Sequence, residues 1–408
     1  MAAKKRRQSK SALLKEPEPS GDAPSPLTES APTTLRSAHT ESFPALLKHL
    51  GASVMVTTYQ AGKLVMLRSD GDVLNTHFRG FGAPMGLAVA GDRLAIGTGL
   101  EVWEFHNAPA VAARLEPPGK HDACFLPRGS HTTGNIQIHE MAWGDTASRE
   151  RDRLEPELWF VNTRFSCLCT RDRHYSFVPR WRPPFISSLA PEDRCHLNGL
   201  AMRDGQPRAV TALGVSDEPG GWRQHKRAGG VLIDVPSGEI LTRGLSMPHS
   251  PRYYRDRLWV LNSGAGGLGT IDPRSGDYQS VAELPGFTRG LDFCDRYAFI
   301  GLSQVRESAI FSGIAIADRP VSERCCGIWV VDVVTGETVA SLKFEDGVQE
   351  LFAVQVLPGV RFPDLVNDDR TRLADSFVLP DEPLDAVPVD YVRRSDTTGS
   401  GIQAMNGA

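Results

Sequence analysis

Three histidines in the middle of the chain have the chemistry to bind a metal ion. His139, His196 and His249 each lie at or just before a short apolar run, in IHEMAWG, CHLNGLAM and MPHSPRYY. Imidazole nitrogens bind zinc, copper or iron, and a three-histidine site with an open position can activate water or oxygen. The histidines therefore predict a transition-metal site, provided that the fold brings them together.

Other polar residues stand at the same place in similar runs. Asn198 begins NGLAM, Arg289 lies in TRGLDF and Gln349 begins QELFAV. A guanidinium binds carboxylate or phosphate through two parallel hydrogen bonds, so Arg289 predicts an anionic group on the ligand. Asn198 and Gln349 would add substrate-binding hydrogen bonds. Glu140 follows His139 and could act as a general base with His139 and Arg289, although alternation along a strand would point it the other way and favour a structural role.

Each of these residues also has a purely structural interpretation. A histidine at the start of a strand can simply hydrogen-bond a backbone carbonyl group between neighbouring repeats, and no closely spaced ligand pair such as HExxH supports a metal. Arg289 could instead form an ion pair between repeats. A metal site, a metal-free polar ligand site and structural histidines all stay open.

The candidate residues belong to a repeated strand pattern, which is clearest in residues 247–277. A short run after His249 is followed by the apolar strand LWVLNSG and by LGTID, and the third strand ends in the tight-turn sequence PRSGD. Three short strands make an antiparallel meander. A meander cannot bury both of its faces alone, so it predicts neighbours of the same kind.

The pattern occurs six times along the chain. The aligned positions are Met85, His139, Asn198, His249, Arg289 and Gln349. Their separations of about 40 to 60 residues are typical of four-stranded propeller blades with loop insertions. The sequence therefore predicts an all-β protein, a six-bladed β-propeller of four-stranded antiparallel blades. The innermost strands of a propeller run beside its axis, so the aligned side chains are expected to converge there.

The two ends of the chain are expected to close the ring. Residues 53–78 contain three more strand patterns, but they precede the first aligned position. Little chain with strand patterning follows Gln349. We therefore expect 53–78 to complete the blade whose inner strand contains Gln349. The preceding run SFPALLKHLG predicts a short helix that ends at Gly51.

Composition gives the domain boundaries. Residues 1–40 are rich in Ser, Pro, Thr, Ala and Glu and predict a disordered tail, whereas 41–362 form the predicted propeller domain. Residues 363–408 are acidic and polar, and they predict a peripheral or disordered C-terminal tail.

The bulk numbers exclude several classes of partner. The formal net charge of −4 argues against a dedicated nucleic-acid binder, which needs a net basic face. The sequence contains neither a run of 18 apolar residues nor the apolar core of a signal peptide. Its 7 cysteines are odd in number and mostly lie in or beside apolar strands, which indicates a reducing compartment. We expect a soluble cytoplasmic protein with no membrane partner.

Several motifs resemble a known family. The runs HLNGLAM, MPHSPRYY, LWVLNSGAGGLG, LPGFTRGLDF and GLSQVRES resemble a bacterial family of hypothetical proteins classed as a domain of unknown function. The resemblance covers residues 42–362 and implies the propeller, but no activity. At the level of the fold, the architecture is also similar to six-bladed lactonases, strictosidine-synthase-like enzymes and the zinc-dependent amidating lyase, all of which work at the axial channel. Histidines stand here where the calcium lactonases have acidic and asparagine ligands, which disfavours a hard-cation site.

Two functions follow from these observations. The first is an enzyme that uses a transition metal on His139, His196 and His249 and acts on a small molecule or peptide with an anionic group. The second is a non-catalytic propeller whose rim loops bind a protein or peptide partner. Metal analysis of the purified protein separates the two, because only the first requires near-stoichiometric metal.

Overall fold

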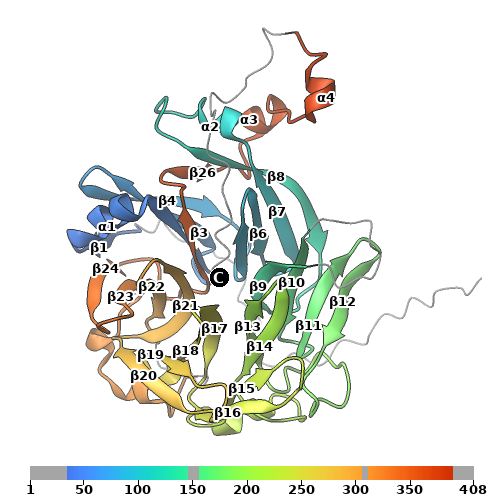
Figure 1. Cartoon of the computed structure of the whole chain (residues 1–408), viewed down its shortest axis with the longest axis vertical. Coiled ribbons are helices and arrows are strands. Elements are labelled where there is room, and N and C mark those ends of the chain that lie inside the picture. The colour runs from blue at the N-terminus through green and yellow to red at the C-terminus, as the bar shows by residue number, and fades with distance from the viewer. Residues whose placement is uncertain (1–34, 146–155, 306–310, 389–408) are drawn as a thin grey trace, which may run out of the picture. The chain divides into compact units, whose positions relative to one another are not determined.

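A computed structural model describes residues 35–145, 156–305 and 311–388. Six antiparallel sheets surround a common axis, and together they form the predicted six-bladed β-propeller (Figure 1). The parts of the two predicted tails at 1–34 and 389–408 lie outside the described residues.

Three blades are built from four consecutive strands, ordered from the axis to the rim. The first contains β9 (Ile138–Gly144), β10 (Glu157–Asn162), β11 (Cys167–Asp172) and β12 (Tyr175–Trp181). The second contains β13 (Leu197–Arg203), β14 (Gln206–Ala212), β15 (Gly230–Asp234) and β16 (Ile240–Leu245). The third contains β17 (His249–Tyr254), β18 (Arg257–Asn262), β19 (Gly267–Ile271) and β20 (Tyr278–Glu283).

Two further blades gain a fifth strand at the rim. One contains β5 (Leu87–Ala90), β6 (Arg93–Gly97), β7 (Glu101–Asn107) and β8 (Ala123–Thr132), with β26 (Pro363–Leu365) parallel to β8. The other contains β21 (Phe287–Cys294), β22 (Tyr297–Ser303), β23 (Gly327–Asp332) and β24 (Thr338–Phe344), with β1 (Ser37–His39) antiparallel to β24.

These extra strands correct the predicted boundaries at residues 40 and 363. Ser37–His39 and Pro363–Leu365 were assigned to tails, yet both pair with a blade. An outermost strand exposes a row of unpaired backbone N–H and C=O groups, and a short segment of almost any composition can satisfy them. Composition therefore made the predicted propeller domain a few residues too short at both ends.

The last blade joins the two ends of the ordered chain. Its inner strand, β25 (Val354–Pro358), pairs with β2 (Ala52–Thr58), which is followed by β3 (Lys63–Asp70) and β4 (Val73–Gly80). The prediction that 53–78 close the ring is thus confirmed. The inner strand begins beyond Gln349, however, so Gln349 lies in the segment that leads to the strand and not in the strand itself.

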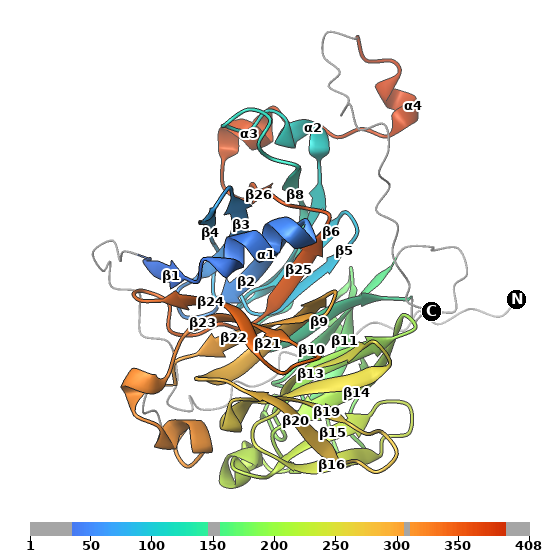
Figure 2. The same cartoon turned by 60° about the vertical axis from the view of Figure 1, so that its left-hand side comes forward.

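Helix α1 (Ser42–Leu50) fastens the closing blade to its neighbour. Its buried Phe43 and Leu47 belong to one core cluster with Val54 of β2 and Leu342 of β24, so the helix covers both blades (Figure 2). Gly51 ends the helix in the left-handed conformation, as the sequence predicted. None of the described helices is long and apolar enough to span a membrane.

The remaining helices are short and lie in connections between strands. They are α2 (Pro109–Ala112), α3 (Arg370–Ala374), α4 (Asp381–Leu384), η1 (Gly221–His225), η2 (Ser263–Ala265), η3 (Ala315–Asp318) and η4 (Val321–Glu323). Trp222 of η1 and Ile316 of η3 share a core cluster with Phe287, at the beginning of inner strand β21. These loops therefore cover the end of the propeller at which the inner strands begin.

Candidate functional site at the propeller axis

The same kind of turn leads into four of the six inner strands. Two residues before the aligned position, the backbone is left-handed at Ala83, Gln137, His196 and Met247, with φ between 45° and 52°. Residues other than glycine rarely adopt this conformation. Its repetition shows that these strands begin in the same way, which directs the aligned side chains towards the axis.

A small cavity lies where the inner strands begin. It has about 210 Å³ of empty space, part of which is open to solvent. Its lining consists of His139, Glu140, Asn198, His249, Ser250, Arg289, Phe352 and Ala353. The structure thus brings together four of the six aligned positions, and it places the ring of His196 beside them, 4.9 Å from the ring of His139.

Two of the axial histidines are held in the same way. His139 Nδ1 lies 2.9 Å from the carbonyl oxygen of Gln137, and His249 Nδ1 lies 2.9 Å from that of Met247. A carbonyl oxygen only accepts, so Nδ1 carries the proton in both rings and Nε2 is left with its lone pair. Burial, assisted by the charge of Arg289, holds both pKa values well below the usual range. Both imidazoles are therefore neutral near pH 7.

Arg289 is a cation without a carboxylate partner. Its Nη2 donates to His139 Nε2 at 2.9 Å, and its guanidinium carbon lies 3.7 Å from the centre of the Phe352 ring. Within the described residues it forms no ion pair, and its buried Nε has no hydrogen-bond partner. Burial lowers its pKa to about 10, so the group stays charged at neutral pH. The alternative of an ion pair between repeats is not what the structure shows.

Asn198 provides a second unused donor. Only 2% of the residue is exposed, and its Oδ1 accepts from the hydroxyl of Thr211 at 2.6 Å. Its amide Nδ2 is buried without a partner. A buried donor that is left unpaired costs about 1 to 3 kcal/mol, so two such donors at one small cavity require an explanation.

Glu140 and Gln349 are placed differently from the other candidates. The Glu140 carboxylate pairs with Arg252 Nη2 at 2.6 Å, across the ring, and only 8% of the residue is exposed. This ion pair is the structural role that strand alternation favoured, and use of Glu140 as a base would leave Arg252 unpaired. Gln349 is not brought to the cavity, because the closing blade presents Phe352 there instead.

His196 is held by a carboxylate. Its Nδ1 lies 3.0 and 2.9 Å from the two oxygens of Asp193, and the indole N–H of Trp222 donates to Asp193 at 3.0 Å. Asp193 therefore fixes the proton on Nδ1, and Nε2 has no hydrogen-bond partner in the described chain. Sequence reasoning missed both Asp193 and Trp222. The run DRCH, with an acid three residues before His196, was the available signal for Asp193.

The three histidines do not fit a three-histidine metal site as they are placed. Arg289 donates a hydrogen bond to Nε2 of His139, whose lone pair a metal ion would need. Among the described residues, no three His, Cys, Asp or Glu side chains are arranged to hold a metal ion. The predicted zinc, copper or iron stays a prediction for metal analysis to test.

Comparison with known proteins adds the family. No curated protein sequence matches the chain. Solved structures that resemble it include a chain of a nidogen/laminin complex, with 7% identity and a TM-score of 0.45, covering 76% of this chain and 99% of that one. A protein of unknown function from Bacteroides caccae has 9% identity and a TM-score of 0.45, covering 75% and 98%. Streptogramin B lyase has 11% identity and a TM-score of 0.35, covering 70% and 74%.

These structural likenesses are too weak to add to the strand pairing itself. The family model is more informative, since the one described as Domain of unknown function (DUF4915) matches residues 41–366. This range contains every axial residue discussed above and confirms the resemblance inferred from the sequence. Because the match covers most of the chain, the protein belongs to the DUF4915 family.

Proposed function

We propose that the propeller binds a small molecule or peptide at its axis through an anionic group, most simply a carboxylate. The observation that carries the proposal is the pair of buried, unpartnered donors at one cavity, Arg289 Nε and Asn198 Nδ2. A carboxylate has two acceptor oxygens, one for each of these two donors. An anionic ligand would thus remove the cost of leaving both donors unpaired.

The charges around the cavity favour an anion over a neutral or cationic ligand. Arg289 is positive, His139 and His249 are neutral, and the charge of Glu140 is balanced by Arg252. Arg289 is therefore the one cation that lines the cavity without an ion-pair partner in the described chain, although the charge of Glu350 also acts on it. Because the groups of the site are buried, the attraction to an anion is stronger than it would be in water.

The pair Asp193–His196 adds acid–base chemistry to this binding site. The carboxylate holds Nδ1–H, so Nε2 is available to accept a proton from a ligand group or a water molecule. His196 lies beside the cavity, next to the ring of His139. This arrangement supports an enzyme that moves a proton on a substrate anchored by Arg289.

Thermal melts with a panel of carboxylates and phosphate test the proposal. Carboxylates are expected to raise the melting temperature of the wild-type protein. Arg289→Lys should weaken binding by on the order of 1 to 3 kcal/mol, because an ammonium group cannot form two parallel hydrogen bonds. Arg243→Lys, at an exposed residue of strand β16, is the matched control and should bind like the wild type.

Two outcomes would contradict the proposed anion site. If no carboxylate or phosphate shifts the wild-type melting temperature, or if Arg289→Lys retains the full shift, the axial cavity is not an anion site. A loss of stability in Arg289→Lys without any ligand-dependent shift in the wild type would assign Arg289 a structural role.

A further inference from the structure

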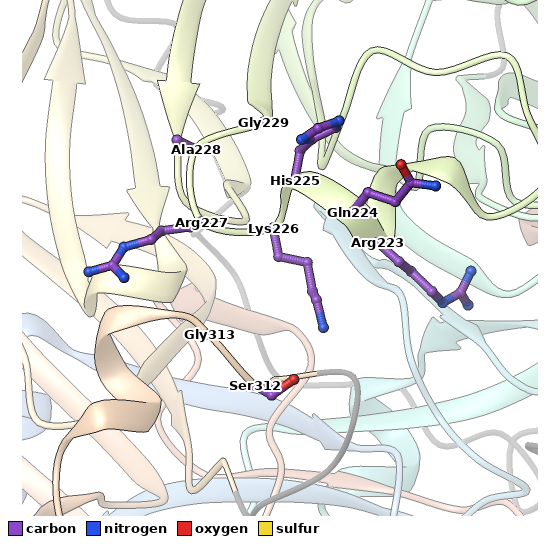
Figure 3. Close-up of a pocket in the computed structure, with 9 residues that line it drawn as sticks. All are labelled: Arg223, Gln224, His225, Lys226, Arg227, Ala228, Gly229, Ser312 and Gly313. Atoms are coloured by element: carbon purple, nitrogen blue, oxygen red, sulfur yellow. The ribbon is translucent and has the colours of Figure 1, made fainter.

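A second pocket opens on the loop that follows strand β14. It is lined by the loop residues 223–229 together with Ser312 and Gly313, and it has about 750 Å³ of empty space, including the part open to solvent. Arg223, Lys226 and Arg227 contribute three positive charges, of which Arg223 lies 3.9 Å from Asp193, and none of the described lining residues is acidic. Figure 3 shows Lys226 reaching towards Ser312, with Arg223 and Arg227 on its two sides.

The loop is held in place from below by Trp222. The indole ring is 2% exposed and belongs to a core cluster with Leu213, Met247, Phe287 and Ile316. At the other end of the loop, the backbone N–H of Gly229 donates to the carbonyl oxygen of His225 at 2.6 Å. The loop is therefore anchored by Trp222 at one end and closed by a local turn at the other.

The positive charges on this loop are close enough to influence one another. Partial burial and the charge of Arg223 lower the pKa of Lys226. The whole chain has a formal net charge of −4, so the sign of this pocket is opposite to that of the protein. A local excess of positive charge attracts anions and raises their concentration at the surface.

A continuous row of rings connects this pocket with the axial cavity. The Trp222 ring lies 4.5 Å from the His196 ring, which lies 4.9 Å from the ring of His139 at the cavity wall. On its outer side, Arg223 lies over the Trp222 ring at 4.6 Å. These packed rings place the loop pocket and the axial cavity at the same end of the propeller, so an extended ligand that lies over this end can contact both Arg289 and the cations of the loop.

We propose that the ligand of the axial site is an extended molecule with two anionic ends, such as a dicarboxylate or an acidic peptide. One end is bound by Arg289 and Asn198, and the other lies in the loop pocket near Arg223 and Arg227. This inference rests on the proposed axial anion site. It explains why a propeller with a net negative charge presents a cationic pocket beside that site.

Carboxylates of matched chain length test the inference. Binding of straight-chain monocarboxylates and of the corresponding α,ω-dicarboxylates, from short to long, is measured by titration calorimetry on the full-length protein. Beyond a threshold length, the dicarboxylate should bind about tenfold or more tightly than the monocarboxylate, as expected for one additional charged contact. Arg227→Glu should abolish this gain and leave monocarboxylate affinity unchanged, whereas Arg243→Glu, outside the pocket, should preserve the gain.

The outcomes separate this inference from the axial site on which it rests. If monocarboxylates bind in an Arg289-dependent way but no dicarboxylate binds more tightly at any length, the second site is excluded and the axial site stands. If the gain persists in Arg227→Glu, the loop pocket does not hold the second group. If no carboxylate binds, or if binding is independent of Arg289, the axial site fails and this inference fails with it.

Discussion

Two buried polar clusters of this propeller contain similar side chains but differ in one respect. In the C-terminal clamp, defined here as Arg79, His77 and His121 around Asp364, the carboxylate accepts from Arg79 at 2.7 Å and lies 3.3 Å from His77. In the axial cluster, Arg289 contacts His139 and Phe352 but no carboxylate of the described chain.

The difference assigns a different role to each cluster. In the clamp, the anion is part of the chain, and it fastens strand β26, which pairs with β8, to strand β4 of the neighbouring closing blade. The interactions with His77 and Arg79 hold the pKa of Asp364 below its usual range in spite of burial. In the axial cluster, the cation is present and no carboxylate of the described chain pairs with it, so the proposed function assigns the anion to a ligand. The same residue types thus stabilise the fold at the rim and are available for binding at the axis.

The largest effect is expected when the clamp loses its carboxylate. Asp364→Ala leaves Arg79 without its ion-pair partner next to two histidines, and we expect a loss of about 3 kcal/mol in the free energy of unfolding. Denaturant unfolding measures it. The exposed ion pair Arg36–Asp346 provides the control, since Asp346→Ala should cost less than about 1 kcal/mol. If Asp364→Ala and Asp346→Ala lower the free energy of unfolding equally, the clamp does not stabilise the fold more than an exposed ion pair does.

Acid should act on the buried histidines, those of the axial cluster and His121 of the clamp, in one pH range and on Asp364 in another. Burial lowers the pKa of His121, His139 and His249, so the native state binds fewer protons than the unfolded chain, whose histidines titrate near pH 6.5. This stability is fully present above about pH 6.5 and is lost as the pH falls below it, by up to about 1.4 kcal/mol per histidine and pH unit. The contribution of Asp364 is present above about pH 4 and is lost only in stronger acid.

Variants can separate these two ranges. His249→Asn should flatten the dependence of the unfolding free energy between pH 6.5 and 5, and Asp364→Asn should flatten it below about pH 4. Denaturant unfolding at a series of pH values measures both slopes. If the His249 variant retains the wild-type slope in the upper range, the buried histidine is not neutral in the native state.

Removal of the axial cation should affect binding more than folding. Arg289→Ala leaves no carboxylate unpaired, so its cost is limited to the contacts with His139 and Phe352, about 1 kcal/mol. The same variant should lose the carboxylate-dependent rise in melting temperature. A destabilisation as large as that of Asp364→Ala would contradict the distinction between the two clusters.

The smallest effect is expected at Gln349. Its side chain does not line the cavity, so Gln349→Ala should change the free energy of unfolding by less than about 0.5 kcal/mol and leave carboxylate affinity unchanged. Phe352→Ala is the informative partner, because it removes the ring under Arg289 and should weaken carboxylate binding. A larger loss of carboxylate affinity in Gln349→Ala than in Phe352→Ala would show that Gln349, and not Phe352, belongs to the axial site.

Much of the fold could be predicted because each blade repeats one local pattern. His139, Asn198, His249 and Arg289 precede the same kind of apolar strand, and a common turn brings them to the axis. In the closing blade, the polar Gln349 was aligned with them, but the aromatic Phe352 occupies the corresponding place.

The contacts between blades could not be predicted from the sequence. Glu140 and Arg252 pair although they are 112 residues apart, and Arg289 bonds to a histidine 150 residues away. Local patterns contain no information on distances across the axis. For this reason, the sequence could group the histidines but left a metal site, a metal-free ligand site and a structural role open, whereas the structure shows that Arg289 contacts one of them.

The state of the Arg289 Nε–H group tests the central claim most directly. In the ¹⁵N NMR spectrum of the arginine-labelled protein, this resonance is assigned by its loss in Arg289→Lys. If the donor is unpaired until an anion binds, the resonance will shift on titration with a carboxylate and saturate with the dissociation constant found by calorimetry. A resonance that stays unchanged at saturating carboxylate would contradict the account, because the axial arginine would then not be the group that binds the ligand.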